Sequence, residues 1–478
     1  MQAEGEPLAP IVVDGHPLPP KSCAMNRWVM GKLPTCAANP FYVLVHGQAG
    51  SGKSLLLKSI AYGVRNHFQY GDACIVIAPV AMAANRIGGK TIHSTFILKW
   101  GPTTYDDFME EATDQILENL SWMKEAKILV IDNINFVGAV DFARIDHRLQ
   151  QVTGVEKPFG GLSVIVFGDF HQVKPVDGLW IFEDLEPEYE WKAQRETPHS
   201  PAKLWSLFKI VELESKNWRA EIEEQKFFDF MRDGFEEEEE ELREYLKDSC
   251  FVCWDINETL DTLVNVYFQN IYYRQNYDFV FLCVNDEIAS DINAAIAERL
   301  GNKVFKPQRS NGDRFAKKWN TGNEVLIVSI GSPVVLLESF QNINAGAIGH
   351  VEDFTNHEIT VRFPNDGFVS IQRLEYEYEF ERFQQFPLRL AYAHTIESAQ
   401  GATFDGIILV RNHTWSQEEK YNWKDIHEDY HGQLYTAMSR CRSIENCGII
   451  PMRWLQWVCA PEVLEELERM RRDNSLRI

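Results

Sequence analysis

A glycine-rich segment near the start of the chain holds residues whose types and spacing could do chemistry. It reads Gly47-Gln48-Ala49-Gly50-Ser51-Gly52-Lys53-Ser54 and lies between an apolar run at 41–45 and a helix-like stretch at 55–60. Glycines allow backbone N–H groups to turn inward around phosphate oxygens, and the N-terminus of the following helix adds a favourable dipole. We therefore expect Lys53 to reach the β- and γ-phosphates of a nucleoside triphosphate, and Ser54 to hold Mg²⁺.

Two later strand-like runs end in polar residues that would complete such a site. The run at 128–131 is followed by Asp132, a carboxylate of the kind that coordinates Mg²⁺ beside a phosphate loop. The run at 162–167 leads into Gly168-Asp169-Phe170-His171-Gln172, where Gln172 could sense the γ-phosphate or orient the attacking water. The sequence thus predicts ATP and Mg²⁺ as cofactors, with Ser54 and Asp132 as metal ligands.

Length and composition limit the classes of protein to which the chain can belong. A chain of 478 residues suggests about three domains. No apolar run approaches the ~20 residues of a membrane span, and the first 20 residues do not resemble a secretory signal, so no membrane partner is expected. Nine cysteines, an odd number, favour reduced thiols in an intracellular protein, and Cys250 and Cys253 are expected to be a buried pair rather than a zinc site.

Charge and hydrophobic patterning divide the chain further. The net charge of −23 excludes a broadly basic surface, although a local positive groove could still bind nucleic acid. The acidic run 236–241 is expected to be a solvated helix or loop. The alternative is an interaction tail that binds a basic partner. Apolar runs at 74–78, 128–131 and 162–167 predict a buried parallel sheet, and those at 279–284 and 406–410 predict a second one. Short β-type runs over 324–382 predict a small β insertion, and 461–472 predicts one charged helix.

The order of the motifs resembles the PIF-one family of superfamily 1, RecD-like DNA helicases, in its eukaryotic or transposon-encoded branch. The likeness runs from about Phe41 to Ile450. It is carried, besides the phosphate loop, by a first strand-binding motif at 78–94, a third motif at 158–176, Asn217-Trp218-Arg219, the entry to the β insertion at 331–337, a fifth motif at 386–403 and a sixth at 434–440.

This resemblance implies an α/β fold with two RecA-like P-loop domains and a small β-barrel-like insertion in the second. The expected divisions are a lead segment at 1–40, a first domain at 41–209, a second domain at 210–323 and 384–460 that contains the acidic run, the insertion at 324–383, and a C-terminal helix at 461–478.

The resemblance also implies a function. It is that of an ATP-dependent DNA helicase or translocase that moves 5′ to 3′ on single-stranded or forked DNA, in DNA repair, recombination or telomere maintenance. We expect a monomer in the nucleus, with the cytoplasm and mitochondria as alternatives. The implied site residues are Lys53, Asp132, Asn133, Gln172, Arg219 and Arg440 for catalysis, Gly401 on the nucleotide side, and Thr91, His93, Ser94, Thr395 and Thr403 for DNA. Phe96 and Trp100 could either stack on bases or pack in the core.

The chain departs from the family at the position that should activate water. The family pair is Asp-Glu, whereas this chain has Asp132-Asn133, and Asp141 is the next carboxylate downstream. An amide can hydrogen-bond a water molecule but cannot take its proton. The fifth motif also departs, with Glu397 where the family has His and Ser398 where it has Lys. A helicase-like protein that binds ATP and DNA but hardly hydrolyses ATP is therefore the alternative function.

Overall fold

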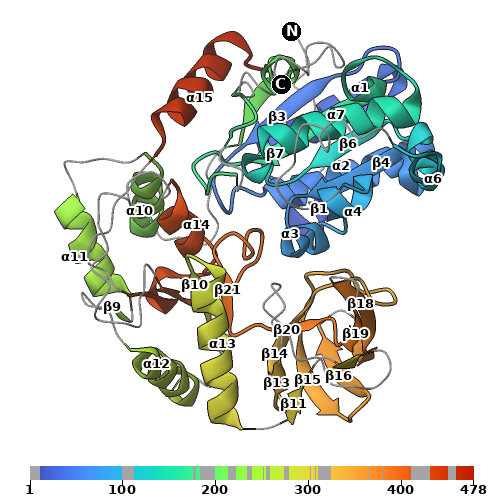
Figure 1. Ribbon diagram of the computed structural model, residues 1–478. Helices are drawn as coiled ribbons and strands as arrows, with labels where there is room; N and C mark the ends of the chain where they lie inside the picture. The colour runs from blue at the N-terminus through green and yellow to red at the C-terminus, as the bar shows by residue number, and fades with distance from the viewer. Residues whose placement is uncertain are drawn as a thin grey trace. The chain divides into compact units, whose positions relative to one another are not determined.

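The structure is a computed structural model that describes residues 11–98, 112–175, 179–183, 200–213, 222–233, 239–250, 252–253, 259–273, 279–301, 303–306, 308–309, 325–364, 366–378, 381–410, 431–450 and 459–478. The chain divides into two compact units (Figure 1). Unit 1 comprises Met1–Pro79, Ile87–Arg219 and Cys459–Ile478, and unit 2 comprises Val80–Arg86 and Ala220–Val458. Each unit is therefore assembled from segments that are far apart in the sequence.

Unit 1 is built on a six-stranded sheet in the order β5-β4-β6-β7-β3-β8. Every neighbouring pair of strands is parallel. The strands are β3 (Tyr42–His46), β4 (Cys74–Ala78), β5 (Lys90–Thr91), β6 (Ile128–Ile131), β7 (Ser163–Gly168) and β8 (Lys209–Glu212). Because all strands run the same way, their carboxyl ends meet at one edge, where ligands of open α/β sheets bind.

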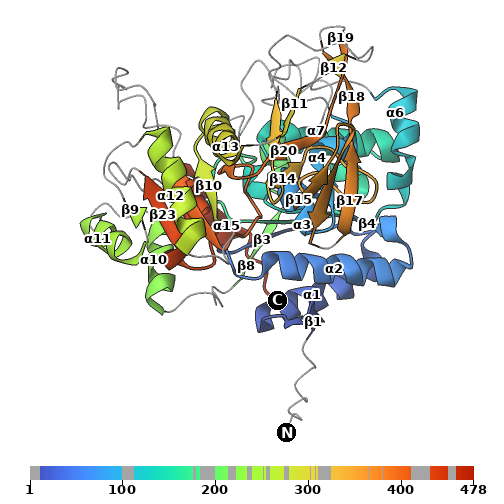
Figure 2. The ribbon, with the colours of Figure 1, turned by 90° about the horizontal axis from the view of Figure 1, so that it is seen from below.

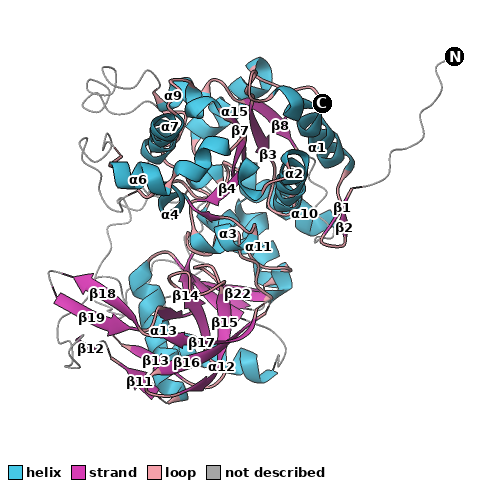
Figure 3. Ribbon diagram, turned by 90° about the vertical axis from the view of Figure 1, so that its right-hand side faces the viewer, coloured by secondary structure: helices cyan, strands magenta, loops and turns pink. Residues whose placement is uncertain are grey.

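Helices cover both faces of this sheet. The described helices of unit 1 are α1 (Pro20–Lys32), α2 (Lys53–Phe68), α4 (Ile92–Phe96), α6 (Asp114–Asn119), α7 (Ala139–Thr153), α9 (Pro201–Trp205) and α15 (Pro461–Asp473). Side chains alternate between the faces of a strand, and Leu44, Leu129 and Val164 share one face with the core under α7 and α9. Figure 3 shows α7 and α9 on one side of the sheet and α1 and α2 on the other.

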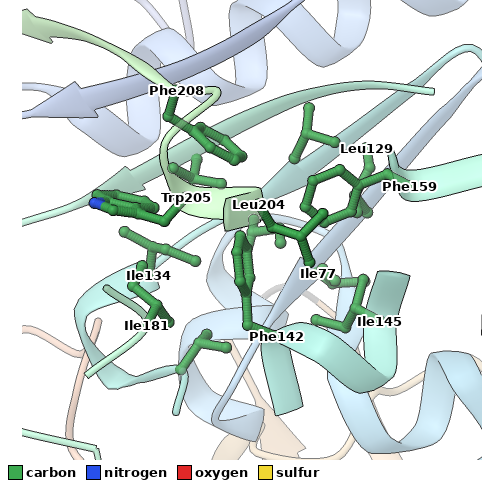
Figure 4. Close-up of a cluster of buried hydrophobic side chains, with 14 of the residues drawn as sticks. Ile77, Leu129, Ile134, Phe142, Ile145, Phe159, Ile181, Leu204, Trp205 and Phe208 are labelled. Atoms are coloured by element: carbon green, nitrogen blue, oxygen red, sulfur yellow. The ribbon is translucent and has the colours of Figure 1, made fainter. Parts of the chain in front are cut away.

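Aromatic side chains fill the core between the sheet and α7 (Figure 4). The rings of Phe142 and Phe159 lie 5.4 Å apart between centroids, and those of Trp205 and Phe208 lie 5.3 Å apart. All four side chains are fully buried. Such rings bury a large apolar area, which makes this layer a rigid base for the loops at the sheet edge.

Helices α1 and α15, from the early and late parts of the chain, pack within unit 1. Helix α1 lies alongside α2 (Figure 2), where the Asn26 amide donates to the Ser59 hydroxyl at 2.8 Å. Helix α15 is held by the Trp205 indole N–H, which donates to Glu466 at 2.7 Å. A short antiparallel pair, β1 (Val12–Val13) and β2 (His16–Pro17), precedes α1.

Unit 2 has a five-stranded parallel sheet in the order β21-β10-β22-β23-β9. Its strands are β9 (Val252–Cys253), β10 (Phe279–Cys283), β21 (Ala393–Thr395), β22 (Gly406–Val410) and β23 (Cys447–Ile450). Its helices are α3 (Ala81–Arg86), α10 (Ile222–Asp233), α11 (Glu239–Ser249), α12 (Leu260–Tyr273), α13 (Asp286–Leu300) and α14 (Gln433–Met438).

An antiparallel insertion interrupts unit 2 between α13 and β21. Its main sheet has the order β17-β16-β15-β14-β20, and two smaller sheets pair β11 with β13 and place β12-β19-β18 side by side. The strands are β11 (Lys303–Phe305), β12 (Gln308–Arg309), β13 (Leu326–Val328), β14 (Pro333–Leu336), β15 (Ile348–Phe354), β16 (Glu358–Phe363), β17 (Gly367–Gln372), β18 (Leu374–Tyr378), β19 (Glu381–Gln385) and β20 (Leu388–Leu390).

The α/β fold with parallel sheets expected from the sequence is thus confirmed. Several expectations concern residues outside the described ranges: Arg219, Trp100, the start of the acidic run at 236–238 and the side chain of Cys253. None of the cysteines that the structure describes takes part in a disulfide. Among the described helices, none is long and apolar enough to cross a membrane.

Candidate nucleotide site and strand-binding segments

The phosphate loop connects β3 to α2 in unit 1. Gly52 is the N-cap of α2 with φ 86°, a left-handed conformation that favours glycine. A Cβ on Gly47 would lie 2.7 Å from the Ser51 hydroxyl, so a larger residue there would displace the Ser51 side chain. No side chain caps α2, and its first turn has no acidic residue. The first N–H groups of α2 are therefore available to a phosphate.

Lys53 lies at the first position of α2 and folds back over the loop. Its Nζ donates to the backbone carbonyls of Gly47, at 2.5 Å, and Gln48, at 2.8 Å. These contacts hold the ammonium group above the loop, where phosphate oxygens would compete for it. The position agrees with the role expected for Lys53.

Ser54 and Asp132 meet at the carboxyl edge of the sheet. The Ser54 hydroxyl lies 3.5 Å from Oδ2 of Asp132, whose side chain is buried at the end of β6. Two hard oxygen donors so close to each other suit Mg²⁺, which binds oxygens at about 2.0–2.1 Å and keeps several water ligands. The two residues predicted as metal ligands are therefore brought together and fit that ion.

Asn133 follows directly and has an unusual backbone. Its φ of 52° and ψ of 47° are left-handed, a conformation that asparagine adopts more readily than most residues. The backbone N–H donates to Oδ1 of Asp132 at 3.0 Å. The buried side-chain Nδ2 has no hydrogen-bond acceptor among the described residues. A buried amide N–H without a partner is costly, and a bound water or phosphate oxygen would satisfy it.

Gln172 lies on the loop after β7, the strand next to β6, with its side chain buried. Its backbone N–H donates to the Asp169 carbonyl at 3.0 Å. Asn135, which the sequence analysis did not single out, ties this loop to the one after β6: its side chain accepts from the Asp169 N–H at 3.4 Å and donates to the Val173 carbonyl at 3.5 Å. The signal for Asn135 was its place two residues after Asn133.

The first strand-binding motif divides between the units. Thr91, His93 and Ser94 lie together in unit 1, where the Thr91 hydroxyl caps α4 by accepting from the Ser94 N–H at 3.2 Å. Oδ2 of Asp141 lies 3.8 Å from Nε2 of His93. Burial lowers the pKa of His93, and this effect outweighs the Asp141 carboxylate, which raises it. His93 would therefore meet DNA as a neutral hydrogen-bonding group.

Two neighbouring residues bear on the same motif. Phe96 is fully buried in the core of unit 1. Of the two roles considered, stacking on bases and packing in the core, the structure shows packing. Lys90, which the sequence analysis did not select, is exposed next to Thr91 and offers the positive charge that a DNA phosphate prefers.

The remaining candidates lie in unit 2. The Thr395 hydroxyl accepts from the Ser398 N–H at 3.1 Å, and Thr403 is partly exposed. Gly401 packs against Ala83 of α3, and its carbonyl accepts from the Arg86 guanidinium. Burial raises the pKa of Glu397, the residue that stands where the family has His.

Arg440 follows α14 and is buried in unit 2. Its Nε donates to the Thr436 carbonyl at 3.1 Å, and its Nη2 donates to the Ser439 hydroxyl at 2.8 Å. These contacts fix the guanidinium on its own helix. The structure therefore places Lys53, Ser54, Asp132, Asn133 and Gln172 in unit 1, and Arg440, Gly401, Thr395 and Thr403 in unit 2.

His394, beside Thr395, makes the pH dependence of stability testable. Burial, followed by the charge of Arg389, lowers the pKa of His394 to about 3. Below about pH 6.5, His394 is protonated in the unfolded chain but stays neutral in the folded chain. The free energy of unfolding therefore falls by up to about 1.4 kcal/mol per pH unit until the pH reaches the folded pKa of His394. We expect the stability of the native chain to fall, relative to His394→Asn, as the pH falls from about 6.5 to about 5.

Urea unfolding at the two pH values checks this expectation. The difference between the native chain and His394→Asn should shift by up to about 2 kcal/mol. Replacing the exposed His357 by Asn is the matched control and should leave the difference constant. A constant difference for His394→Asn as well would contradict the neutral, buried histidine.

The parallel sheet, the uncapped phosphate loop and the Ser54–Asp132 pair define unit 1 as a P-loop nucleotide-binding domain. The model of the PIF1-like helicase family matches residues 32–233. Over this segment the chain is similar to the PIF1-like, or PIF-one, helicase family.

Individual relatives agree. The chain is similar to ATP-dependent DNA helicase PIF6 of Trypanosoma brucei brucei, at 26% identity over 84% of this chain and 50% of that protein. It is also similar to ATP-dependent DNA helicase Pif1 of Bdellovibrio bacteriovorus, at 26% identity over 88% of this chain and 87% of that one. The matched part is thus half of the first relative and most of the second. A crystal structure of Bacteroides Pif1 helicase with ADP-AlF3 and single-stranded DNA is similar over 94% of this chain and 98% of that chain, with 26% identity and a TM-score of 0.68.

Proposed function

We propose that this chain is an ATP-dependent DNA helicase that couples slow ATP hydrolysis to movement on single-stranded or forked DNA. The observation that carries the proposal is the site at the carboxyl edge of unit 1, where Lys53, Ser54 and Asp132 meet over an uncapped helix N-terminus. Relatives named as DNA helicases, and a similar structure that holds single-stranded DNA, support DNA as the partner.

The residues of unit 1 have separable tasks in this proposal. The N–H groups of α2 and the Lys53 ammonium bind phosphate oxygens and neutralise their charge. Mg²⁺, held by Ser54 and Asp132, would supply further charge neutralisation when bound. Gln172 and the Asn133 amide orient the attacking water, but neither takes its proton. Hydrolysis is therefore slow rather than absent.

Arg440 of unit 2 and Arg219 are proposed to act on the γ-phosphate, as the family resemblance implies. Thr91, His93 and Ser94 in unit 1, and Thr395 and Thr403 in unit 2, are proposed to contact the strand through hydroxyl and imidazole groups. Work on chromosomal DNA in repair, recombination or telomere maintenance would place the protein in the nucleus, as a monomer with reduced thiols.

Unwinding of tailed duplexes tests this function. The full chain with ATP should release the labelled strand from a duplex with a 5′ single-stranded tail, and it should leave a duplex with a 3′ tail intact. Lys53→Ala provides the background. Release from neither substrate above that background would contradict the helicase, and release from the 3′ tail alone would contradict only the proposed polarity.

A second function is favoured by Asn133 itself. Without a base, the chain would bind ATP and DNA and act as a nucleotide-dependent clamp. Single-turnover measurements separate the two proposals, because a clamp would hold radiolabelled ATP unchanged while its affinity for a single-stranded oligonucleotide changes. A helicase would release labelled phosphate on each turnover.

A further inference from the structure

A second group of side chains at the edge of the unit 1 sheet has no place in the proposed chemistry of ATP. His46 ends β3, Asp169 follows the end of β7, and Glu212 ends β8. These three strands are neighbours in the order β7-β3-β8. Because parallel strands end at the same edge, the fold itself brings these residues together with His171 of the loop after β7.

The distances within the group are those of a set of metal ligands. Oδ1 of Asp169 lies 3.6 Å from Nε2 of His46 and 3.1 Å from Nδ1 of His171. One nitrogen or oxygen from each of the three residues lies within 4.8 Å of the others. Ligand atoms around a tetrahedral ion with bonds of 2.0–2.1 Å lie about 3.4 Å apart, which falls between the two measured distances.

We propose that His46, Asp169 and His171 form a binding site for a zinc-type divalent cation. Two imidazoles and one carboxylate suit Zn²⁺, whereas Mg²⁺ prefers oxygen ligands alone. The three residues are buried, at 1%, 0% and 5% exposure, and a water molecule would take the fourth position around the ion. This site is chemically distinct from the oxygen pair of Ser54 and Asp132, and it does not depend on the proposed function.

Glu212 supplies the outer contact that metal-bound histidines commonly have. Its Oε1 lies 3.6 Å from Nδ1 of His46, the ring nitrogen that faces away from Asp169. A carboxylate on the second nitrogen fixes the tautomer and orientation of a ligating histidine. Arg471 in turn holds Glu212 through a hydrogen bond of 2.8 Å. Glu212 is therefore a positioning residue for the site.

The ion would also stiffen the loop that carries Gln172. His171 directly precedes Gln172. The backbone N–H of His171 donates to Oδ1 of Asp169 at 3.3 Å, and the backbone N–H of Gln172 donates to the Asp169 carbonyl at 3.0 Å. Fixing Asp169 and His171 on one ion would hold this loop against the end of β3. There, the backbone N–H of Gly47, the residue after β3, donates to the Gly168 carbonyl at 3.2 Å.

Metal binding by the full chain tests the proposal. Chelator-treated protein is titrated with Zn²⁺ against a chromophoric competitor, and separately with Co²⁺ as a spectroscopic substitute. We expect one tight equivalent of Zn²⁺, with visible Co²⁺ bands of a four-coordinate nitrogen and oxygen site and no thiolate-to-cobalt charge-transfer band. A charge-transfer band on the tight equivalent would assign the ion to cysteines and overturn the proposal.

Four variants locate the ion. His46→Gln and His171→Gln should each weaken binding by at least ~100-fold, and Glu212→Gln should weaken it by about 10–100-fold. His67→Gln, which removes an exposed histidine of α2, should leave it unchanged. Equal Zn²⁺ binding by the native chain, His46→Gln and His171→Gln would overturn the proposal and leave a hydrogen-bonded His–Asp–His network.

Thermal unfolding in chelator and in Zn²⁺ guards against misfolded variants. Zn²⁺ should raise the midpoint of the native chain and of His67→Gln, but not that of His46→Gln or His171→Gln. If both ligand variants fail to fold, Glu212→Gln decides, because it leaves all three ligands in place. Unchanged affinity in Glu212→Gln would then count against the site.

Discussion

Lys53→Ala is expected to lower the kcat of DNA-stimulated ATP hydrolysis by about 10²–10³-fold or more, the loss seen when one preorganised charge-stabilising donor is removed. The Lys53 ammonium lies directly above the phosphate loop, held by the carbonyls of Gly47 and Gln48. No other cation in the loop 47–54 could replace it. Steady-state phosphate release with saturating single-stranded DNA measures the effect.

Lys58→Ala is the matched control for this variant. Lys58 lies on the same helix, and its ammonium pairs with Asp14 on the surface at 3.0 Å. Exposed pairs contribute little to stability, so Lys58→Ala should keep native hydrolysis and a native melting temperature. Persistent DNA-stimulated hydrolysis in Lys53→Ala would mean that ATP is not hydrolysed at this loop.

Asn133→Glu is expected to raise the rate of ATP hydrolysis. A general base typically contributes about 10²–10⁴-fold, and the carboxylate would follow the buried Asp132 at the end of β6. The left-handed backbone at 133, with φ 52°, opposes the change, because a left-handed conformation costs most residues about 1–2 kcal/mol. We therefore expect a faster but slightly less stable enzyme, measured by phosphate release and thermal unfolding.

Asn133→Gln separates the effect of side-chain basicity on the rate from the effect of side-chain length. Glutamine matches glutamate in length but cannot accept the proton. Its kcat should stay near the native value, whereas that of Asn133→Glu rises. An equal gain in both variants would show that reach, rather than basicity, limits the native chain, and no gain in either would mean that another part of the site is incomplete.

Much of the fold could be predicted from the sequence, because buried parallel strands are continuous apolar runs. Strands β4 (Cys74–Ala78), β6 (Ile128–Ile131) and β22 (Gly406–Val410) begin and end where the patterns predicted. Strands β8 and β9 were not predicted. Lys209-Ile210-Val211-Glu212 has only two apolar residues, and β9 has two residues in all, so tertiary pairing rather than pattern makes them strands.

That the candidate nucleotide-site residues lie at one edge of the sheet could also be expected, since each of their motifs directly follows a strand of the parallel sheet. Structure was needed for what depends on neighbours in space. Whether Phe96 stacks on bases or packs in the core could not be decided until its burial was known. The His46–Asp169–His171 group needs the strand order β7-β3-β8, which no local pattern contains. Arg219 lies outside the described residues, and its role stays a proposal.

Steady-state ATP hydrolysis by the native full chain, measured over a range of single-stranded oligonucleotide concentrations, tests the central claim most directly. Coupling of ATP to DNA requires that both bind and that the strand speeds turnover. We predict that hydrolysis rises with DNA to a plateau well above that of Lys53→Ala. A native rate equal to that of Lys53→Ala at every DNA concentration would contradict the helicase and leave a protein that only binds its nucleotide.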